Sequence, residues 1–312
     1  MPVLKLIAGT SHPTLAREIS KILKVPLTPI TIKKFADGEI YVRVDKTIRG
    51  QDVYVIQSLG NPVNENLLEL LIILDSLRRA SVGKINLVIP YLCYSRQDRK
   101  NISREPITAK LISNMITYAG ANRLITYDLH ADQIQGFYDI PVDHLLGYPL
   151  FVKHLTKSDL KNLVVVSPDV GGVKRANKLA DYLGVPIAII DKIRTRHNES
   201  MVAHIVGDVE GKVALIIDDM VDTGGSITNA AKEVMNRGAK KCIICATHPI
   251  LSKNALERLT NSPASKIIFL NTLPTPKSLD KKFKIVSVAP VLAQVIKLTS
   301  SNKPLEDLFV SL

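Results

Sequence analysis

One stretch of the sequence, residues 213–226, reads Val-Ala-Leu-Ile-Ile-Asp-Asp-Met-Val-Asp-Thr-Gly-Gly-Ser. Its five apolar residues predict a short buried strand that ends at the acidic pair Asp218 and Asp219. After Ser226, apolar residues recur at helical spacing as far as Met235, and Gly238 supplies a stop for that helix. The stretch therefore predicts a strand, a tight loop and a helix.

The loop has the composition of a sugar-phosphate site. Glycines let the backbone approach an anion closely, and the N–H groups and dipole of a helix N-terminus favour phosphate. Carboxylates repel phosphate, so the acidic pair must face sugar hydroxyls or a divalent cation. An N-capped helix after a parallel strand is the plainer interpretation, but three aspartates within five residues exceed what capping requires. The candidate ribose-phosphate residues are Asp218, Asp219, Asp222, Thr223, Gly224, Gly225 and Ser226.

The bulk composition indicates a soluble α/β protein with two domains. The chain has 312 residues, which is more than a single hydrophobic core usually contains. Strand and helix patterns alternate in both halves, and the alternation restarts near Gly147. We therefore expect two similar domains, each a mainly parallel sheet flanked by helices, at 1–147 and 148–289. Composition leaves open which domain the last segment, 290–312, packs on, and the first is our candidate.

The same composition excludes several classes of function. No signal peptide is visible, and the most apolar windows are too short to span a bilayer, so we expect a cytoplasmic protein. Cys242 and Cys245 have the spacing of a redox pair, but their apolar neighbours favour a buried strand. A net charge of +12 suggests acidic partners. Because the lysines are dispersed, phosphate-rich small molecules fit that charge better than nucleic acid does.

Two features of the first half are candidates for a nucleotide site. Residues 30–45 predict a hairpin that turns at the two-residue pair Asp37-Gly38. Its tip could stack a base, or the hairpin could be only a structural ribbon. Residues 94–100 place three cations in a loop at the end of a strand, where open α/β sheets bind ligands. A solvated charged face is the alternative for this loop.

Three further positions carry candidate chemistry. His130 follows the strand predicted at 123–127, and it is either a structural residue or a ligand of a cation–triphosphate complex. The loop Asp169-Val170-Gly171-Gly172 is either a simple turn or a second anion loop whose acid reaches a cation. Residues 191–211 interrupt the alternation with a polar, cationic segment. That segment is either a surface hairpin or a closing loop that brings Lys192 and Arg194 to the reacting centre.

Taken together, these motifs resemble the ribose-phosphate diphosphokinase (phosphoribosyl-pyrophosphate synthetase) family, which has the type I phosphoribosyltransferase fold. The resemblance covers nearly the whole chain, and its strength lies in the colinear order of the motifs. It is carried by residues 35–39, 94–99, 106–110, 128–131, 133–136, 167–172, 191–194 and 213–226.

The resemblance implies an enzyme that transfers the diphosphoryl group of Mg-ATP to ribose 5-phosphate, giving 5-phosphoribosyl 1-pyrophosphate and AMP for nucleotide biosynthesis. It further implies a homo-oligomer, dimers often assembled into hexamers, in which neighbouring subunits share the ATP site. The catalytic residues would be Lys192 and Arg194, and Arg194 would also contact ribose 5-phosphate. Asp169, Gly171 and Gly172 would form the pyrophosphate loop, and His130 and Asp169 would serve Mg²⁺. The ATP-binding residues would be Phe35, Asp37, Glu39, Arg96, Gln97, Asp98, Arg99 and Lys100.

Two other functions remain open at this point. A phosphoribosyltransferase shares the sugar-phosphate loop but needs no adenine-binding hairpin. A non-catalytic regulatory subunit of such a synthetase keeps the fold but loses the catalytic residues. The tail Lys303-Pro-Leu-Glu-Asp-Leu-Phe309 lacks the serine that many bacterial relatives carry before Leu-Phe, so the resemblance does not extend to regulation by phosphate and ADP.

Overall fold

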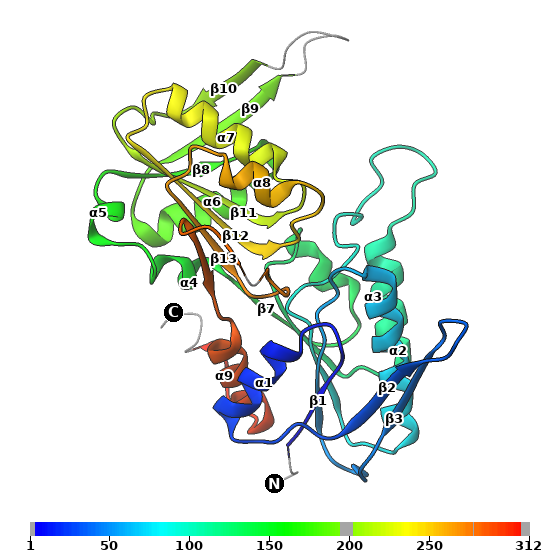
Figure 1. Ribbon diagram of the computed structural model, residues 1–312. Helices are drawn as coiled ribbons and strands as arrows, with labels where there is room; N and C mark the ends of the chain where they lie inside the picture. The colour runs from blue at the N-terminus through cyan, green and yellow to red at the C-terminus, as the bar shows by residue number, and fades with distance from the viewer. Residues whose placement is uncertain (1–3, 194–201, 277, 307–312) are drawn as a thin grey trace. The chain divides into compact units, whose positions relative to one another are not determined.

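A computed structural model of the chain describes residues 4–193, 202–276 and 278–306. The chain forms two compact units. Unit 1 consists of Met1–Leu146, Thr272–Pro274 and Ser287–Leu312, and unit 2 consists of Gly147–Asn271 and Thr275–Val286. Both units are mixed α/β structures, as the sequence predicts (Figure 1).

Unit 1 is built on a parallel five-stranded sheet of order β1-β4-β5-β6-β7. The strands are β1 (Lys5–Ala8), β4 (Val53–Ile56), β5 (Ile85–Val88), β6 (Arg123–Tyr127) and β7 (Val142–Leu145). A separate antiparallel hairpin joins β2 (Ile30–Lys34) to β3 (Ile40–Val44). The helices are α1 (Pro13–Leu23), α2 (Val63–Arg79), α3 (Thr108–Ala119), α9 (Ala289–Ser300) and the 3₁₀ turn η1 (Asp132–Phe137).

Unit 2 is built on a seven-stranded sheet of order β10-β9-β8-β11-β12-β13-β14. All its strand pairs are parallel except β9 with β10. The strands are β8 (Leu163–Ser167), β9 (Ile187–Ile193), β10 (Val202–Val206), β11 (Val213–Val221), β12 (Lys241–Pro249), β13 (Lys266–Leu270) and β14 (Phe283–Val286). The helices are α4 (Tyr148–Val152), α5 (Lys157–Leu160), the 3₁₀ turn η2 (Val170–Gly172), α6 (Val173–Leu183), α7 (Gly225–Asn236) and α8 (Ala255–Thr260).

The two units repeat one order of elements. In unit 1, strand β1, helix α1 and the hairpin β2-β3 are followed by β4, α2, β5, α3 and β6. In unit 2, β8, α6 and the antiparallel pair β9-β10 are followed by β11, α7, β12, α8 and β13. Each unit therefore has a first strand paired in parallel with the strand that follows its hairpin.

The helix α9 belongs to unit 1, where it packs against α1 (Figure 1). Its residues Val291, Leu292 and Ile296 are buried. The hydroxyl groups of Tyr54 in β4 and Thr299 in α9 lie 2.8 Å apart and share a hydrogen bond. The last helix thus returns to the unit in which the chain begins.

Apolar runs and helical spacing explain the core of unit 2. The central strands β8, β11, β12 and β13 are buried almost throughout, as expected for parallel strands covered on both faces. Helix α7 buries Ile227, Ala230, Ala231 and Val234, the positions that the periodicity predicts. The cysteines of β12 are also buried, which confirms the prediction of a strand rather than a redox pair.

Strand β11 corrects one sequence prediction. The strand does not end at the acidic pair but continues to Val221, because β12 remains in register with it. Met220 pairs with His248 and Val221 with Pro249. Long-range pairing therefore extends the strand through residues whose local composition predicts a loop.

Two further predictions need correction. The hairpin of unit 1 turns through three residues rather than two, since the N–H of Phe35 donates to the carbonyl of Glu39 and the N–H of Gly38 donates to that of Phe35. Gly38 has a φ of 96°, the left-handed conformation that such a turn requires at its last position. Strand β9 also continues through Lys192, which pairs with Ala203, although a loop was expected from Asp191 onward.

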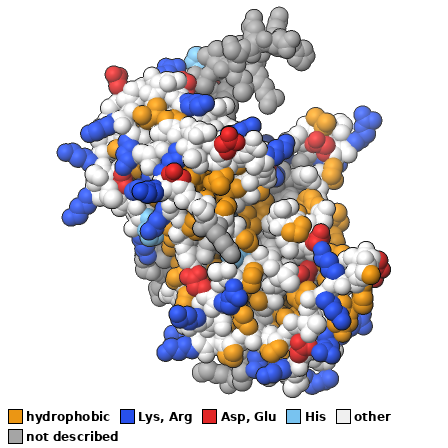
Figure 2. All heavy atoms as spheres, in the orientation of Figure 1, with side chains coloured by type: hydrophobic (Ala, Val, Ile, Leu, Met, Phe, Trp, Pro, Cys, Tyr) orange, Lys and Arg blue, Asp and Glu red, His pale blue; other side chains and the backbone are white. Residues whose placement is uncertain are grey.

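Charged side chains are spread over the visible surface of the protein (Figure 2). On the face shown in Figure 2, lysine and arginine side chains are scattered among other types and do not form one stripe. None of the helices in the described part of the chain has the length and apolar character needed to cross a bilayer.

Candidate active site

The predicted sugar-phosphate loop lies between the end of β11 and the start of α7. Gly224 caps the helix in the left-handed conformation, with a φ of 75°. Its carbonyl accepts hydrogen bonds from the N–H (3.1 Å) and hydroxyl (2.8 Å) of Thr228. Because the first N–H groups of a helix have no intrahelical partner, those of Gly225 and Ser226 are available to an anion.

Three hydrogen bonds hold the carbonyl groups of this loop. The N–H of Leu251 donates to Val221 (3.0 Å), and the N–H of Ser252 donates to Asp222 (2.9 Å). The third comes from Arg258 of α8, which donates to the carbonyl of Thr223 at 3.3 Å. The carbonyl groups of three successive residues, Val221 to Thr223, are therefore held by the segment that leads into α8 and by α8 itself.

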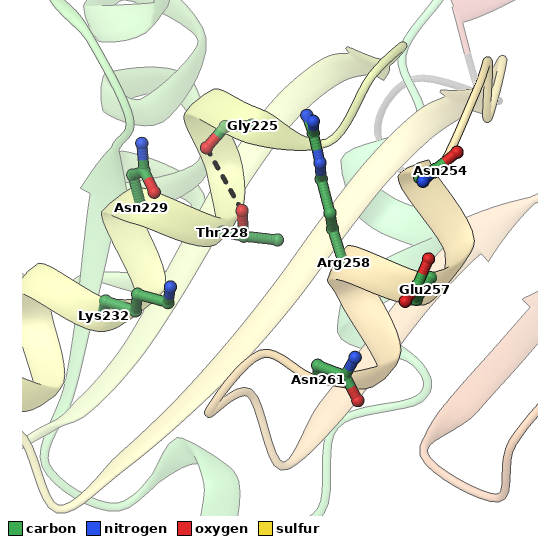
Figure 3. Close-up of a pocket in the computed structure, with 8 residues that line it drawn as sticks. All are labelled: Gly225, Thr228, Asn229, Lys232, Asn254, Glu257, Arg258 and Asn261. Carbon is green, nitrogen blue, oxygen red and sulfur yellow. Dashed lines mark hydrogen bonds between the residues drawn. The ribbon is translucent and has the colours of Figure 1, made fainter.

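A polar groove of about 470 Å³ lies between α7 and α8, beside this loop (Figure 3). Figure 3 shows the side chain of Arg258 standing between the two helices. The lining residues are Gly225, Thr228, Asn229, Lys232, Asn254, Glu257, Arg258 and Asn261.

The acidic pair lies at the end of β11 and contacts a cation that the sequence analysis did not select. The Nη1 atom of Arg175 in α6 lies 3.3 Å from Oδ1 of Asp218 and 3.4 Å from Oδ1 of Asp219. The N–H of Asp219 also donates to Oδ1 of Asp218, at 2.9 Å. Burial and the neighbouring charge of Asp219 raise the pKa of Asp218 well above its ordinary value, and Arg175 opposes that shift.

The second predicted anion loop, 169–172, follows the adjacent strand β8. Oδ1 of Asp169 accepts a hydrogen bond from the N–H of Gly172 at 3.0 Å, and the hydroxyl of Ser167 donates to the carbonyl of Asp169 at 2.7 Å. A Cβ at Gly172 would lie 2.8 Å from Oγ of Ser167, so the tight turn excludes any larger residue. Since β8 and β11 are parallel neighbours, both loops lie at the same edge of the sheet.

The predicted catalytic cations are only partly described. The backbone of Lys192 lies in β9, the neighbour of β8, and β8 is the strand that leads into the 169–172 loop. In the sheet, β9 and β11 lie on opposite sides of β8. Arg194 lies outside the described residues.

In unit 1, the hairpin tip carries the predicted base-stacking residue. The Phe35 ring is 51% exposed and makes an edge contact with Tyr41, with centroids 5.8 Å apart. Oδ1 of Asp37 accepts from the N–H of Glu39 at 3.1 Å, which stabilises the turn. The Phe35 ring is therefore supported by Tyr41 and still accessible to a ligand.

The cationic loop follows β5 and leads into α3. The carbonyl of Gln97 accepts from the N–H of Ala109, and Oδ2 of Asp98 accepts from the amide of Gln133 at 2.8 Å. Arg96, Arg99 and Lys100 are exposed. The loop is thus anchored at its middle residues while its cations face solvent.

His130 follows β6 and is exposed. The turn that carries it is unusual, because Asp128 has a φ of 26°. His144 of β7 stabilises the turn, since its Nε2 atom accepts from the N–H of Leu129 at 2.9 Å. The sequence analysis did not select His144, and an isolated histidine in a predicted strand carries no local signal of such a role.

The predicted metal residues do not form an all-protein metal cage. Among the residues that the structure describes, no three His, Cys, Asp or Glu side chains are grouped to hold a metal ion. Oδ2 of Asp169 has no hydrogen-bond partner within the described ranges, so it could coordinate a cation. Mg²⁺ typically uses one or two carboxylates, waters and substrate phosphates, and the residues present fit that mode of binding.

Besides His144, the sequence analysis missed Arg175 and Arg258, and of these only Arg175 had a local signal. Arg175 is the third residue of α6, directly after the second anion loop, so its place in the first turn keeps it at the same edge of the sheet as the acidic pair. Arg258 had no such signal, because it reaches the loop from a helix 35 residues away.

Together, the fold and the loops define a protein with two phosphoribosyltransferase-type domains. The model of the N-terminal domain of ribose phosphate pyrophosphokinase matches residues 4–120, and that of the phosphoribosyl transferase domain matches residues 150–270. The chain therefore belongs to the ribose-phosphate pyrophosphokinase family, whose members are also called phosphoribosylpyrophosphate synthetases.

Relatives support this membership along the whole chain. A ribose-phosphate pyrophosphokinase of Clostridium perfringens is 51% identical over 98% of this chain and 97% of its own. The protein of the same name from Bacillus subtilis is 49% identical, with the same coverage. The crystal structure of phosphoribosylpyrophosphate synthetase from Mycobacterium smegmatis matches with a TM-score of 0.91 and 43% identity, over 96% of this chain and 99% of that one.

Proposed function

We propose that this chain transfers the diphosphoryl group of Mg-ATP to the anomeric hydroxyl of ribose 5-phosphate. The products are 5-phosphoribosyl 1-pyrophosphate and AMP. The observation that carries the sugar-binding half of this proposal is the combination, in unit 2, of an anion loop at a helix N-terminus with a carboxylate pair at the end of the same strand. The 51% identity to a ribose-phosphate pyrophosphokinase supports the same reaction.

The loop 222–226 would bind the 5-phosphate through the N–H groups at the start of α7. Asp218 and Asp219 would accept hydrogen bonds from the sugar hydroxyls through their carboxyl oxygens. The loop 169–172 would receive the diphosphate, with Asp169 directed toward its cation. These three parts lie at one edge of one sheet, where open α/β sheets bind ligands.

ATP would be held by unit 1. The Phe35 ring would stack on adenine, and the loop 96–100 would neutralise the triphosphate with its three exposed cations. The remaining members of the proposed ATP site are Asp37, Glu39, Gln97 and Asp98. His130 and Asp169 would serve the magnesium complexes, and bound magnesium would neutralise phosphate charge and orient the diphosphate.

In the reaction, the anomeric oxygen forms a bond to the β-phosphorus of ATP, and the bond from that phosphorus to the α–β bridging oxygen breaks. AMP leaves with the bridging oxygen, and the proton of the anomeric hydroxyl passes to water. Negative charge spreads over the phosphoryl oxygens in the transition state, so positioned cations supply most of the stabilisation. Lys192 and Arg194 would provide this charge through charge-assisted hydrogen bonds.

We also propose that the chain forms a homo-oligomer, dimers assembled into hexamers, in which the hairpin tip reaches a neighbouring ATP site. A stripe of exposed apolar side chains on α3 and on the residue before it supports a second copy as partner. Its members are Ile107 (38% exposed), Leu111 (55%), Met115 (38%) and Tyr118 (85%). Light scattering should show that Leu111→Glu lowers the assembly mass, whereas Ile22→Glu on α1 should not. An unchanged mass for Leu111→Glu would remove this stripe as an interface.

A cytoplasmic location is part of the proposal. Cys93, Cys242 and Cys245 are all unpaired, which fits a reducing compartment. Oxidation of these thiols in an oxidising compartment would be opposed by their burial.

Phosphorus NMR tests the proposed reaction directly. Purified protein is mixed with ATP, magnesium and ribose 5-phosphate. A new diphosphate ester on the sugar together with AMP supports a synthetase, and turnover by the isolated chain excludes a purely regulatory subunit. Absence of ATP consumption would reject the proposal, and consumption of added 5-phosphoribosyl 1-pyrophosphate with a purine base would instead indicate a phosphoribosyltransferase.

A further inference from the structure

We infer that Arg175 is a positioning residue that holds Asp218 and Asp219 in the arrangement needed to receive the sugar hydroxyls. The inference rests on the proposed function, because it assigns a role in binding ribose 5-phosphate. Arg175 is not expected to touch the substrate. It acts through the two carboxylates.

The geometry places one nitrogen between two carboxylates. The Nη1 atom of Arg175 lies 3.3 Å from Oδ1 of Asp218 and 3.4 Å from Oδ1 of Asp219. The side chains of Arg175 and Asp219 are only 18% and 4% exposed, so water screens this contact little. The same nitrogen therefore contacts both carboxylates through their Oδ1 atoms.

Asp219 is buried and the neighbouring Asp218 is half-buried, so their carboxylates repel each other, and a cation between them offsets that repulsion. A guanidinium suits this role because it is always charged and its planar N–H groups fix the direction of their acceptors. Without it, the two side chains would separate or rotate, and the sugar hydroxyls would meet acceptors in the wrong place. A positional error of this kind weakens binding without unfolding the protein.

The position of Arg175 along the chain adds a second role. Gly172, whose N–H is held by Asp169, directly precedes α6, and Arg175 lies in the first turn of that helix. The same short segment therefore forms the proposed diphosphate loop and supplies the cation for the acceptor carboxylates.

The test compares Arg175→Gln, Arg175→Lys and a matched control, Arg237→Gln. Arg237 is an arginine of the same unit that pairs with Glu233 on the surface, at the far end of α7. Ribose 5-phosphate binding is measured by calorimetry without ATP, the KM of each substrate is measured by AMP formation, and thermal unfolding checks the fold.

We expect Arg175→Gln to weaken ribose 5-phosphate binding about ten- to a hundredfold, with the KM for ATP and the unfolding temperature nearly unchanged. Arg175→Lys should recover about half of the lost affinity for ribose 5-phosphate, measured as the logarithm of the dissociation constant, because lysine keeps the charge but not the planar geometry. The control should match the wild type. Equal increases in both KM values, no recovery with lysine, or unchanged sugar binding in Arg175→Gln would each overturn the inference. Failure of the wild type to bind ribose 5-phosphate or form AMP would instead reject the proposed function.

Discussion

The Nη1 atom of Arg258 lies 3.3 Å from the carbonyl oxygen of Thr223, so helix α8 holds the proposed phosphate loop from 35 residues further along the chain. The N–H of Ser252, on the connection between β12 and α8, holds the carbonyl of the preceding residue, Asp222. These contacts orient the loop before any ligand arrives, which reduces the ordering cost of binding.

Replacement of Arg258 tests that arrangement. Arg258→Ala should raise the KM for ribose 5-phosphate about fivefold, because one hydrogen bond from a charged donor at a partly exposed site contributes about 1 kcal/mol. Steady-state kinetics of AMP formation measures the change. Lys232→Ala is the control, since Lys232 lines the same groove but belongs to α7. Equal effects of both substitutions would indicate that the groove, and not the contact with Thr223, matters.

Gly224 should not tolerate a side chain. Its φ of 75° is strained for any L-residue, and a Cβ there would lie 3.4 Å from the carbonyl oxygen of Ala255. Gly224→Ala should destabilise the protein by about 1 kcal/mol and weaken binding of ribose 5-phosphate. Gly184→Ala is a matched control, because Gly184 has a φ of 64° but open space around it at the end of α6. The control should lose similar stability but keep its affinity for the sugar.

Lys192→Ala should separate binding from chemistry. If Lys192 acts as a preorganised donor in the transition state, its loss should raise the activation free energy by about 3–5 kcal/mol and lower kcat accordingly, while both KM values change little. Lys240→Ala, at an exposed position before β12, serves as the control. Turnover equal to that of the wild type in Lys192→Ala would remove this residue from the catalytic role.

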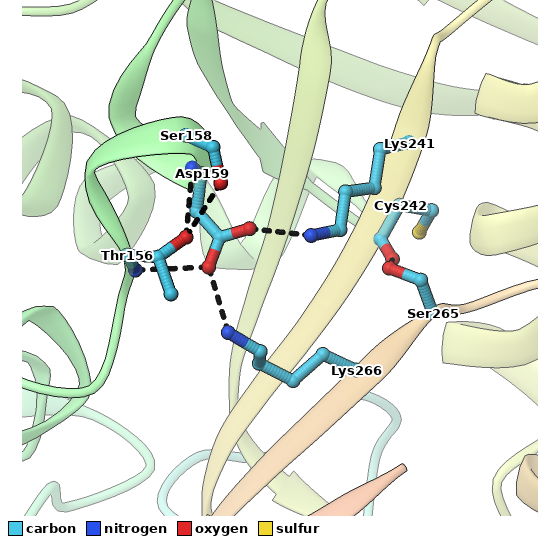
Figure 4. Close-up of polar contacts among 7 residues, drawn as sticks. All are labelled: Thr156, Ser158, Asp159, Lys241, Cys242, Ser265 and Lys266. Atoms are coloured by element: carbon cyan, nitrogen blue, oxygen red, sulfur yellow. Dashed lines mark hydrogen bonds and ion pairs between the residues drawn. The ribbon is translucent and has the colours of Figure 1, made fainter.

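Asp159 should contribute to stability in a pH-dependent way (Figure 4). The side chain is fully buried and pairs with Lys241 and Lys266 at 2.5 and 2.7 Å. Burial alone would raise the pKa of Asp159, but hydrogen bonds from the two lysines and from Thr156 outweigh burial and lower it. Because the folded-state pKa is below the unfolded value, the contribution is fully present above about pH 4 and is lost as the pH falls through the folded pKa.

The matched variants are Asp159→Asn and Asp75→Asn. In urea unfolding at pH 7, the free energy of unfolding of Asp159→Asn should be about 2–3 kcal/mol lower than that of the wild type. Below pH 4 the difference from the wild type should be smaller. Asp75 pairs with Arg79 on an exposed face of α2, so its substitution should cost less than about 0.5 kcal/mol. A difference between Asp159→Asn and the wild type that is constant from pH 7 to pH 3 would contradict the electrostatic explanation.

The three cysteines should be unreactive in the folded protein. Burial raises the pKa of both Cys93 and Cys242 to about 12, and it also raises that of Cys245. Because the thiolate is the reactive form, iodoacetamide at pH 8 should leave all three unmodified until urea unfolds the chain. Mass spectrometry would detect any alkylation, and rapid modification of Cys242 or Cys245 in the native protein would show that β12 opens.

Much of the fold was predictable because its signals are local. The apolar run in β11, the periodicity of α7 and the glycines of the 222–226 loop each depend on residues close together in sequence. The predicted strand and helix of this segment are confirmed for that reason. The hairpin at 30–45 was also correctly located, although its turn has three residues and requires the positive φ of Gly38.

The sequence by itself determined the order of strands and helices, the loops at which carboxylates and glycines gather, and, through their colinear order, the family. Hydrogen bonding within helices and the alternation of apolar residues act over a few positions, so a linear pattern records them. The tertiary structure decided how far β11 and β9 extend, which cation lies between Asp218 and Asp219, and which arginine holds Thr223. Those features depend on contacts between segments far apart in the chain, whose partners become neighbours only when the sheet and its helices pack.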